Sequence, residues 1–149
     1  EATTVGSGIL LSQDVDIYEG ETAAETVVRM LQNNGYSVDY TGNYETGFYL
    51  ARISSESNFV TGNIPEDLRT KLEEHGFEIY DFTPNSLGDY DFTKGSGWMY
   101  QVNGVYPNYG LSDYCFQNGD TLRLRFTLAY GADIGQDMTG GSDNWGYEW

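Results

Sequence analysis

The stretch that decides the fold is Gly97–Tyr130, with the sequence GWMYQVNGVYPNYGLSDYCFQNGDTLRLRFTLAY. Near its end, apolar side chains fall at every second position: Leu122, Leu124, Phe126 and Leu128. This alternation predicts a strand with one apolar and one polar face, as in an antiparallel sheet that is exposed to water on one side. Arg123 and Arg125 lie on the polar face, and in a chain of formal net charge −16 we expect them to pair with carboxylates.

Two Asn-Gly dipeptides mark turns in this stretch. Asn103-Gly104 separates Trp98–Val102 from Val105-Tyr106, and Asn118-Gly119 precedes the alternating strand. Asparagine and glycine both tolerate a positive φ, so each pair predicts a tight hairpin-type turn. Pro107 lacks a backbone N–H, and we expect it to end the strand before it.

The order of motifs in this stretch resembles the transcobalamin-like C-terminal domain family of Gram-positive cell-surface proteins. The motifs are Gly97-Trp98-Met99-Tyr100, Val102-Asn103-Gly104, Tyr106-Pro107-Asn108, Gly110, Asp113-Tyr114 and Asn118-Gly119-Asp120. The family is similar to the domain that closes over cobalamin in transcobalamin and intrinsic factor. The resemblance implies a β-grasp fold, an extracellular location and, at most, ligand binding, because most bacterial members have no assigned function.

The main helix is predicted from Thr22 to Gly35. Thr22-Ala23-Ala24-Glu25 matches a capping box, in which the hydroxyl and the glutamate each bond a free backbone N–H. An apolar stripe follows at helical spacing, formed by Ala24, Val27, Val28 and Leu31. Glu25 and Arg29 have the spacing of a favourable ion pair, and Gly35 suits the left-handed position after the last turn.

Other elements are predicted from shorter patterns. Residues 1–6 are expected to be loose, and the shared parity of Ile9, Leu11, Val15 and Ile17 predicts one bent strand, or two short ones, up to Tyr18. Strands are expected at 36–40 and 48–53, the second of them central because both of its faces are apolar. A second helix begins at Asn63-Ile64-Pro65-Glu66, capped by Asn63, and ends at His75-Gly76. A short strand is predicted at 77–82 and a loop at 83–96.

These elements predict an α+β protein in which a β-grasp-like mixed or antiparallel sheet packs on one main helix. The 149 residues fit a single transcobalamin-like β-grasp domain, with 54–96 as an insertion that carries the second helix. Residues 131–149 are rich in Gly and Asp and have no periodicity, so we expect an extended tail.

Composition excludes several classes of function. With 23 acidic and 7 basic residues, the chain lacks the clustered cations that nucleic acid requires. No apolar run is long enough for a membrane helix, and no signal peptide is recognisable. Cys115 is the single cysteine, so no internal disulfide forms; we expect an inert, buried thiol in a strand. A catalytic pair with His75, the sole histidine, is disfavoured because it ends a separate helix.

The best candidates for ligand contact are four aromatic residues: Trp98, Tyr100, Tyr106 and Tyr109. Their rings have flat apolar faces and polar tips, which suit stacking on a sugar or a planar ligand. The resemblance supports this interpretation, since the related domain contacts cobalamin. Trp98 also suits a core position between sheet and helix. Cobalamin itself is a weaker expectation, because the transcobalamin site is shared with a helical domain for which this sequence shows no pattern.

No catalytic or metal-binding constellation stands out. Asp133, Asp137 and Asp143 with Asn144 offer oxygens for calcium, but their spacing fits no EF-hand loop and a solvated acidic tail explains them. Paired carboxylates for glycoside hydrolysis are available in any chain this acidic, so they carry little information. Phosphate loops, nucleophile elbows and zinc ligand sets are absent from the sequence. We therefore predict no catalytic residue, no metal site and no cofactor.

The sequence thus predicts a non-enzymatic extracellular module, used for ligand binding or as a structural spacer, in a bacterial cell-surface or secreted protein. Its partner would be a small molecule, a glycan or another surface protein. Two alternatives stay open at this point: a carbohydrate-active hydrolase that uses paired carboxylates, and a cobalamin-type small-ligand binder.

Overall fold

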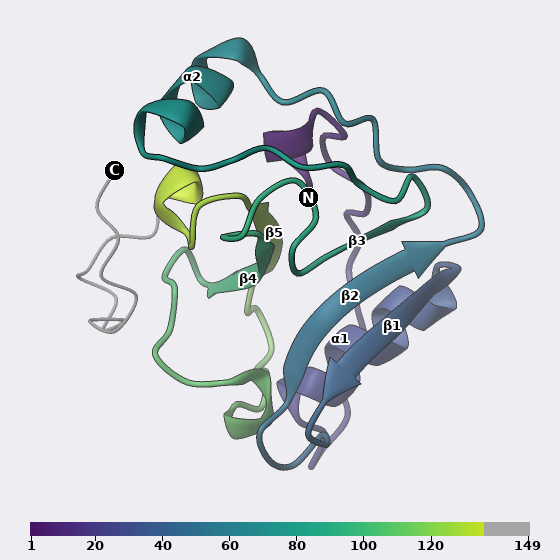
Figure 1. Cartoon of the computed structure of the whole chain (residues 1–149). Coiled ribbons are helices and arrows are strands. Elements are labelled where there is room, and N and C mark those ends of the chain that lie inside the picture. The colour runs from purple at the N-terminus through teal and green to yellow at the C-terminus, as the bar shows by residue number, and fades with distance from the viewer. Residues whose placement is uncertain (136–149) are drawn as a thin grey trace.

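The computed structural model describes residues 1–135 (Figure 1). Its helices are α1 (Ala23–Asn33) and α2 (Glu66–Glu74). One antiparallel sheet contains β1 (Tyr36–Thr41), β2 (Tyr49–Ser55) and β3 (Ser86–Gly88), and a second contains β4 (Gly97–Val102) and β5 (Leu122–Thr127). Short 3₁₀ turns occur at Thr3–Val5, Leu111–Asp113 and Ala132–Ile134. The α+β class is confirmed, whereas the β-grasp topology stays a prediction because these strands form two separate sheets.

Helix α1 forms as its sequence pattern predicts. The Thr22 hydroxyl accepts from the Glu25 N–H at 3.3 Å, and the Glu25 carboxylate accepts from the Thr22 N–H at 2.9 Å. The apolar stripe, including Val27 and Val28, is buried, and Figure 1 shows the helix along one face of the β1–β2 ribbon. The predicted Glu25–Arg29 pair is wrong: the cap uses the Glu25 carboxylate, and Arg29 pairs instead with Glu21 at 2.9 Å.

Strand β2 is the centre of its sheet, as its two apolar faces predict. It pairs with β1 on one edge and with β3 on the other. Asp39 is paired with Arg52 and Tyr40 with Leu50, so Ala51 is an extra residue in β2 and forms a bulge. The bulge lets Leu50 and Ile53, three positions apart, both reach the core. Strand β3 lies within the segment 83–96, which the sequence predicts as loop.

Strand β5 has the predicted apolar face, with Phe126 buried and Leu128 fully buried just beyond the strand. Its partner is β4, in a register that places Trp98 opposite Phe126. The Asn103-Gly104 turn forms as predicted, with both φ angles positive at +52° and +83°. The hairpin after it contains a single bridge between Val102 and Val105. The strand that pairs with β4 along its length is therefore β5, and not the segment that directly follows the turn.

The first residues are ordered, although the sequence predicts them to be loose. Ala2 and Val5 are fully buried, and the Phe126 N–H donates to the Glu1 carbonyl oxygen at 3.1 Å. The Glu1 carboxylate lies 2.8 Å from the Arg123 guanidinium and 3.1 Å from that of Arg125. The expectation that both arginines pair with a carboxylate is confirmed, and one residue serves both.

Several local predictions are wrong. Residues 9–18 contain no strand, because Ile9 and Ile17 find no sheet to cover and remain exposed. Residues 77–82 contain no strand either, since the Tyr80 N–H makes one bond to the Phe92 carbonyl in place of a ladder. Cys115 is exposed and lies outside any strand.

The second helix and the start of the tail also differ from expectation. Pro65 takes the position before α2 without a side-chain cap, while the Asn63 N–H donates to the Val5 carbonyl. In the predicted tail, Ile134 is buried within the last 3₁₀ turn. Neither α1 nor α2, the α-helices within residues 1–135, has the length and apolar character needed to cross a membrane.

The capping box makes α1 sensitive to one hydroxyl. Thr22→Ala removes the acceptor for the Glu25 N–H and the bond that the hydroxyl donates to the Tyr44 carbonyl. We expect the free energy of unfolding to fall by about 1–2 kcal/mol in urea titrations. The matched control is Thr70→Ala, at an exposed position of α2. This variant loses only a bond to the Glu66 carbonyl and should change stability by less than ~0.5 kcal/mol. Equal losses in the two variants would contradict the capping role.

The Arg29–Glu21 ion pair predicts a pH dependence. Hydrogen bonding from Arg29 holds the pKa of Glu21 below its usual value, so its stabilisation is present above the unfolded-state pKa. This stabilisation is lost as the pH falls through the folded-state pKa. Glu21→Gln should therefore cost up to about 1 kcal/mol at pH 7, with the difference from the parent disappearing towards pH 3. Glu19→Gln, the control at an exposed position, should change stability by less than ~0.5 kcal/mol at pH 7.

Candidate functional site

A cleft of about 440 Å³ opens between the two sheets. Its walls come from the start of β2, the loop between β3 and β4, β4 itself and the segment that follows the Asn-Gly turn. The lining residues are 48–50, 89–90, 94–100, 106–111, Leu124, Thr127 and Tyr130. The volume lies within the ~300–1,000 Å³ typical of small-molecule sites.

The four aromatic residues predicted from sequence all line this cleft. Two of them are also structural. The Trp98 indole N–H donates to the Leu87 carbonyl at 2.8 Å, and its ring meets Phe126 edge-on at 5.3 Å. The Tyr106 side chain is buried, and its hydroxyl donates to the Ile134 carbonyl at 2.7 Å. Trp98 and Tyr106 therefore hold the back of the cleft in place, so the core role considered for Trp98 is compatible with a lining role.

Tyr100 and Tyr109 lie nearer the opening. The Tyr100 hydroxyl donates to the backbone carbonyl of Tyr109, and burial raises the pKa of Tyr100. Tyr109 is 38% exposed, and its ring stacks on that of Tyr114 with centroids 5.5 Å apart. Tyr109 thus presents an aromatic face that is supported from behind and accessible from solvent.

Sequence reasoning missed three residues of the cleft: Tyr49, Asp89 and Tyr90. The Tyr49 hydroxyl lies 2.9 and 3.0 Å from the two carboxylate oxygens of Asp89. Burial, followed by this hydrogen bond, raises the pKa of Tyr49 to about 12, and burial also raises the pKa of Asp89. A Cβ at Gly97 would lie 3.1 Å from the carboxylate, so the glycine leaves room for this pair.

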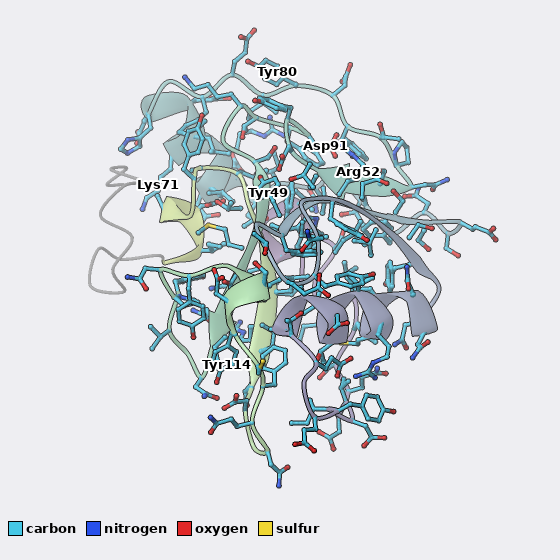
Figure 2. All side chains as sticks on the ribbon, turned by 90° about the horizontal axis from the view of Figure 1, so that it is seen from below. Tyr49, Arg52, Lys71, Tyr80, Asp91 and Tyr114 are labelled. Atoms are coloured by element: carbon cyan, nitrogen blue, oxygen red, sulfur yellow. The ribbon has the colours of Figure 1, made fainter. Side chains whose placement is uncertain are left out.

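The loop that carries Asp89 and Tyr90 is held by a salt bridge. Asp91 accepts from the Arg52 guanidinium at 2.6 Å and from the Gly88 N–H at 2.8 Å (Figure 2). Phe92 is buried and stacks on Phe82, with centroids 4.6 Å apart. With these neighbours fixed, Tyr90 is left 74% exposed at the cleft. The alternation of acid and aromatic residues over 89–92 is the sequence signal that points to this loop.

Asp133, a ligand in the calcium interpretation, has a structural role. Its carboxylate accepts from the Thr127 hydroxyl and from the backbone N–H groups of Leu128 and Ala129, at 2.6 and 3.3 Å. Burial raises its pKa. Its proposed partners Asp137 and Asp143 lie outside the described residues. Within residues 1–135, no three His, Cys, Asp or Glu side chains are grouped so that they could hold a metal ion.

The described lining of the cleft contains one acidic side chain. Asp89 is the sole carboxylate among these residues, and Lys94, Ser96, Asn108 and Thr127 add polar side chains to the tyrosine hydroxyls. Hydrolysis by paired acids needs two carboxyl groups that face each other across the substrate, about 5–9.5 Å apart. The described lining residues do not supply such a pair.

Comparison with known proteins finds a family similar to part of this chain. Residues 75–127, less than half of the chain, match a family described as "Domain of unknown function (DUF4430)", which is known as transcobalamin-like. The matched segment runs from the end of α2 through β5 and contains all four predicted aromatic residues. Tyr49, on the opposite wall, lies outside it. No curated protein and no solved structure matches the chain.

The Arg52–Asp91 pair predicts how strongly the loop is fixed. Asp91→Ala leaves the guanidinium and the Gly88 N–H without their partner. We expect a loss of about 2–3 kcal/mol in the free energy of unfolding, below the ~3–5 kcal/mol of a fully buried pair because Arg52 keeps 28% of its side-chain exposure. Asp81→Ala, at an exposed position, should change stability by less than ~0.5 kcal/mol in the same urea titration. A loss that is no larger for Asp91→Ala than for the control would show that the pair does not fix the loop.

Proposed function

We propose that this protein is a non-enzymatic binding module whose ligand occupies the cleft between the two sheets. The observation that carries the proposal is that aromatic residues from several segments of the chain lie at one cleft. The four aromatic residues chosen from sequence line one cleft of about 440 Å³, together with Tyr49 and Tyr90 from other segments. Aromatic side chains with a few fixed polar groups are typical of small-molecule sites.

The module is proposed to act outside the cell, in a surface or secreted protein of a Gram-positive bacterium. Support comes from the match of residues 75–127 to the transcobalamin-like family and from the motifs that carry the resemblance. The formal charge of −16 is compatible with a solvated module at a surface, and it disfavours anionic partners such as nucleic acid.

Binding is favoured over two other roles. A hydrolase with paired acids needs a second carboxylate opposite Asp89, and the described lining residues do not supply one. A structural spacer would account for buried Trp98 and Tyr106, but it gives no reason for Tyr49 and Tyr109 to be exposed at the same cleft. A corrinoid is the second candidate ligand, because the matched segment is transcobalamin-like.

The test is a thermal-shift titration of the whole chain against cyanocobalamin and a set of neutral hexasaccharides. A ligand at 100 times its Kd stabilises the folded state by about 2.7 kcal/mol, so the Tm should rise by ~5–10 °C and continue to rise with concentration. Tyr109→Ala should remove the shift caused by the probe that binds, because it removes a supported and accessible ring at the opening.

The matched control is Tyr80→Ala. Tyr80 is 43% exposed, close to the value for Tyr109, but it is not among the cleft residues, and Figure 2 shows it well away from Tyr49. It should leave the ligand-induced shift unchanged. The proposal fails if no probe shifts the Tm, or if a shift persists in Tyr109→Ala at the same ligand concentrations.

A further inference from the structure

Four hydrogen-bond donors on the aromatic lining of the cleft are already used inside the protein. The hydroxyls of Tyr49, Tyr100 and Tyr106 donate to Asp89, to the Tyr109 carbonyl and to the Ile134 carbonyl, and the Trp98 N–H donates to the Leu87 carbonyl. These aromatic side chains therefore offer a ligand their ring faces, not their hydrogen-bond donors.

Asp89 provides the opposite kind of group. An ionised carboxylate has about four acceptor positions, and the Tyr49 hydroxyl fills one of them. Asp89 is one of the residues that line the cleft, so its remaining acceptor positions are the ones that a donor on a ligand would meet. A matching ligand has O–H donors next to apolar faces, which is the chemistry of a pyranose ring.

The charges of the cleft favour a neutral ligand. Lys94 and Asp89 supply one positive and one negative side chain among the described lining residues. The chain as a whole carries a formal charge of −16, which repels an anionic polymer. The one cation and the one anion leave the described lining without a net charge of its own, which suits a neutral ligand.

Tyr90 extends the aromatic surface to the rim. Its backbone has a φ of +65°, a conformation that residues other than glycine rarely adopt. The loop is kept in this shape by the bonds of Asp91 to Arg52 and to Gly88, and by buried Phe92. Tyr49, Tyr90 and Tyr109, exposed by 45%, 74% and 38%, then line one cleft and its rim.

We propose that the ligand is a neutral glycan chain, which stacks successive sugar rings on Tyr49, Tyr90 and Tyr109 and donates hydroxyl hydrogen bonds to Asp89. This inference rests on the proposed binding function and adds the chemical class of the ligand. Several exposed rings at one cleft favour a chain over a single sugar. A proline-rich peptide, the other usual partner of aromatic grooves, lacks N–H donors at proline, so it offers the Asp89 carboxylate fewer hydrogen bonds than a glycan does.

The experiment is isothermal titration calorimetry of the whole chain with neutral hexasaccharides of β-1,4-glucose, α-1,4-glucose, mannose, xylose and N-acetylglucosamine. At least one should bind saturably. Tyr90→Asn should weaken that binding by about tenfold, equivalent to 1.4 kcal/mol. Because asparagine accepts a positive φ better than tyrosine, the variant's own stability should be unchanged or higher, which separates loss of contact from loss of fold.

Three further variants complete the test. Asp89→Ala should weaken hexasaccharide binding, whereas Asp81→Ala and Tyr80→Asn, at exposed positions that are not among the cleft residues, should leave it unchanged. Hexasaccharide binding that is unaffected by both Tyr90→Asn and Asp89→Ala would overturn the inference.

Two other ligands separate this inference from the proposed function. Saturable binding of cyanocobalamin or decaproline that is lost in Tyr109→Ala, with no hexasaccharide bound, would overturn the glycan assignment and leave the binding module standing. If hexasaccharides, cyanocobalamin and decaproline all fail to bind, both the glycan assignment and the proposed function are overturned.

Discussion

The hydrogen bond from the Trp98 indole to the Leu87 carbonyl joins the two sheets, and the geometry of the cleft depends on it. Trp98 belongs to β4 and Leu87 to β3, so the bond connects strands that do not share a ladder. Both side chains are buried, and Phe126 packs against the indole from β5. Leaving either polar group unpaired in this environment would cost ~1–3 kcal/mol. The sheets are therefore fixed at the back, while the walls nearer solvent stay apart as a cleft.

A second connection fixes the loop between the same two strands. Arg52 reaches from β2 to Asp91, and Asp91 in turn holds the Gly88 N–H at the end of β3. The chain between β3 and β4 is thereby bound at Asp91 and at buried Phe92, and it tolerates positive φ angles at Tyr90 and Phe92. Strain of this kind persists where the surrounding contacts determine it, and such positions are concentrated at ligand sites.

Local patterns in the sequence predicted the elements whose stabilising contacts are near in sequence. The capping box of α1, the Asn103-Gly104 turn and the alternation of β5 are confirmed for this reason. The missed features depend on partners distant in sequence: the ordered N-terminus that pairs with Arg123 and Arg125, and the pairing of β3 with β2. The site divides in the same way. The four aromatic residues belong to one continuous motif, whereas Tyr49, Asp89 and Tyr90 join them only through tertiary contacts.

Three tyrosine hydroxyls of the cleft donate hydrogen bonds within the protein, and this affects which ligand the proposed module would bind. Because the hydroxyls of Tyr49, Tyr100 and Tyr106 are bonded within the protein, their rings are held in place before a ligand arrives. Binding then loses little side-chain entropy, a cost of about 0.5–1.5 kcal/mol for each group that has to be immobilised. The same bonds leave a ligand that carries only acceptors without partners among these side chains. For the ligand that we propose, the hydrogen bonds that hold the walls rigid leave ring faces as the main contact surface, so the rigidity of the walls is coupled to the chemistry of that ligand.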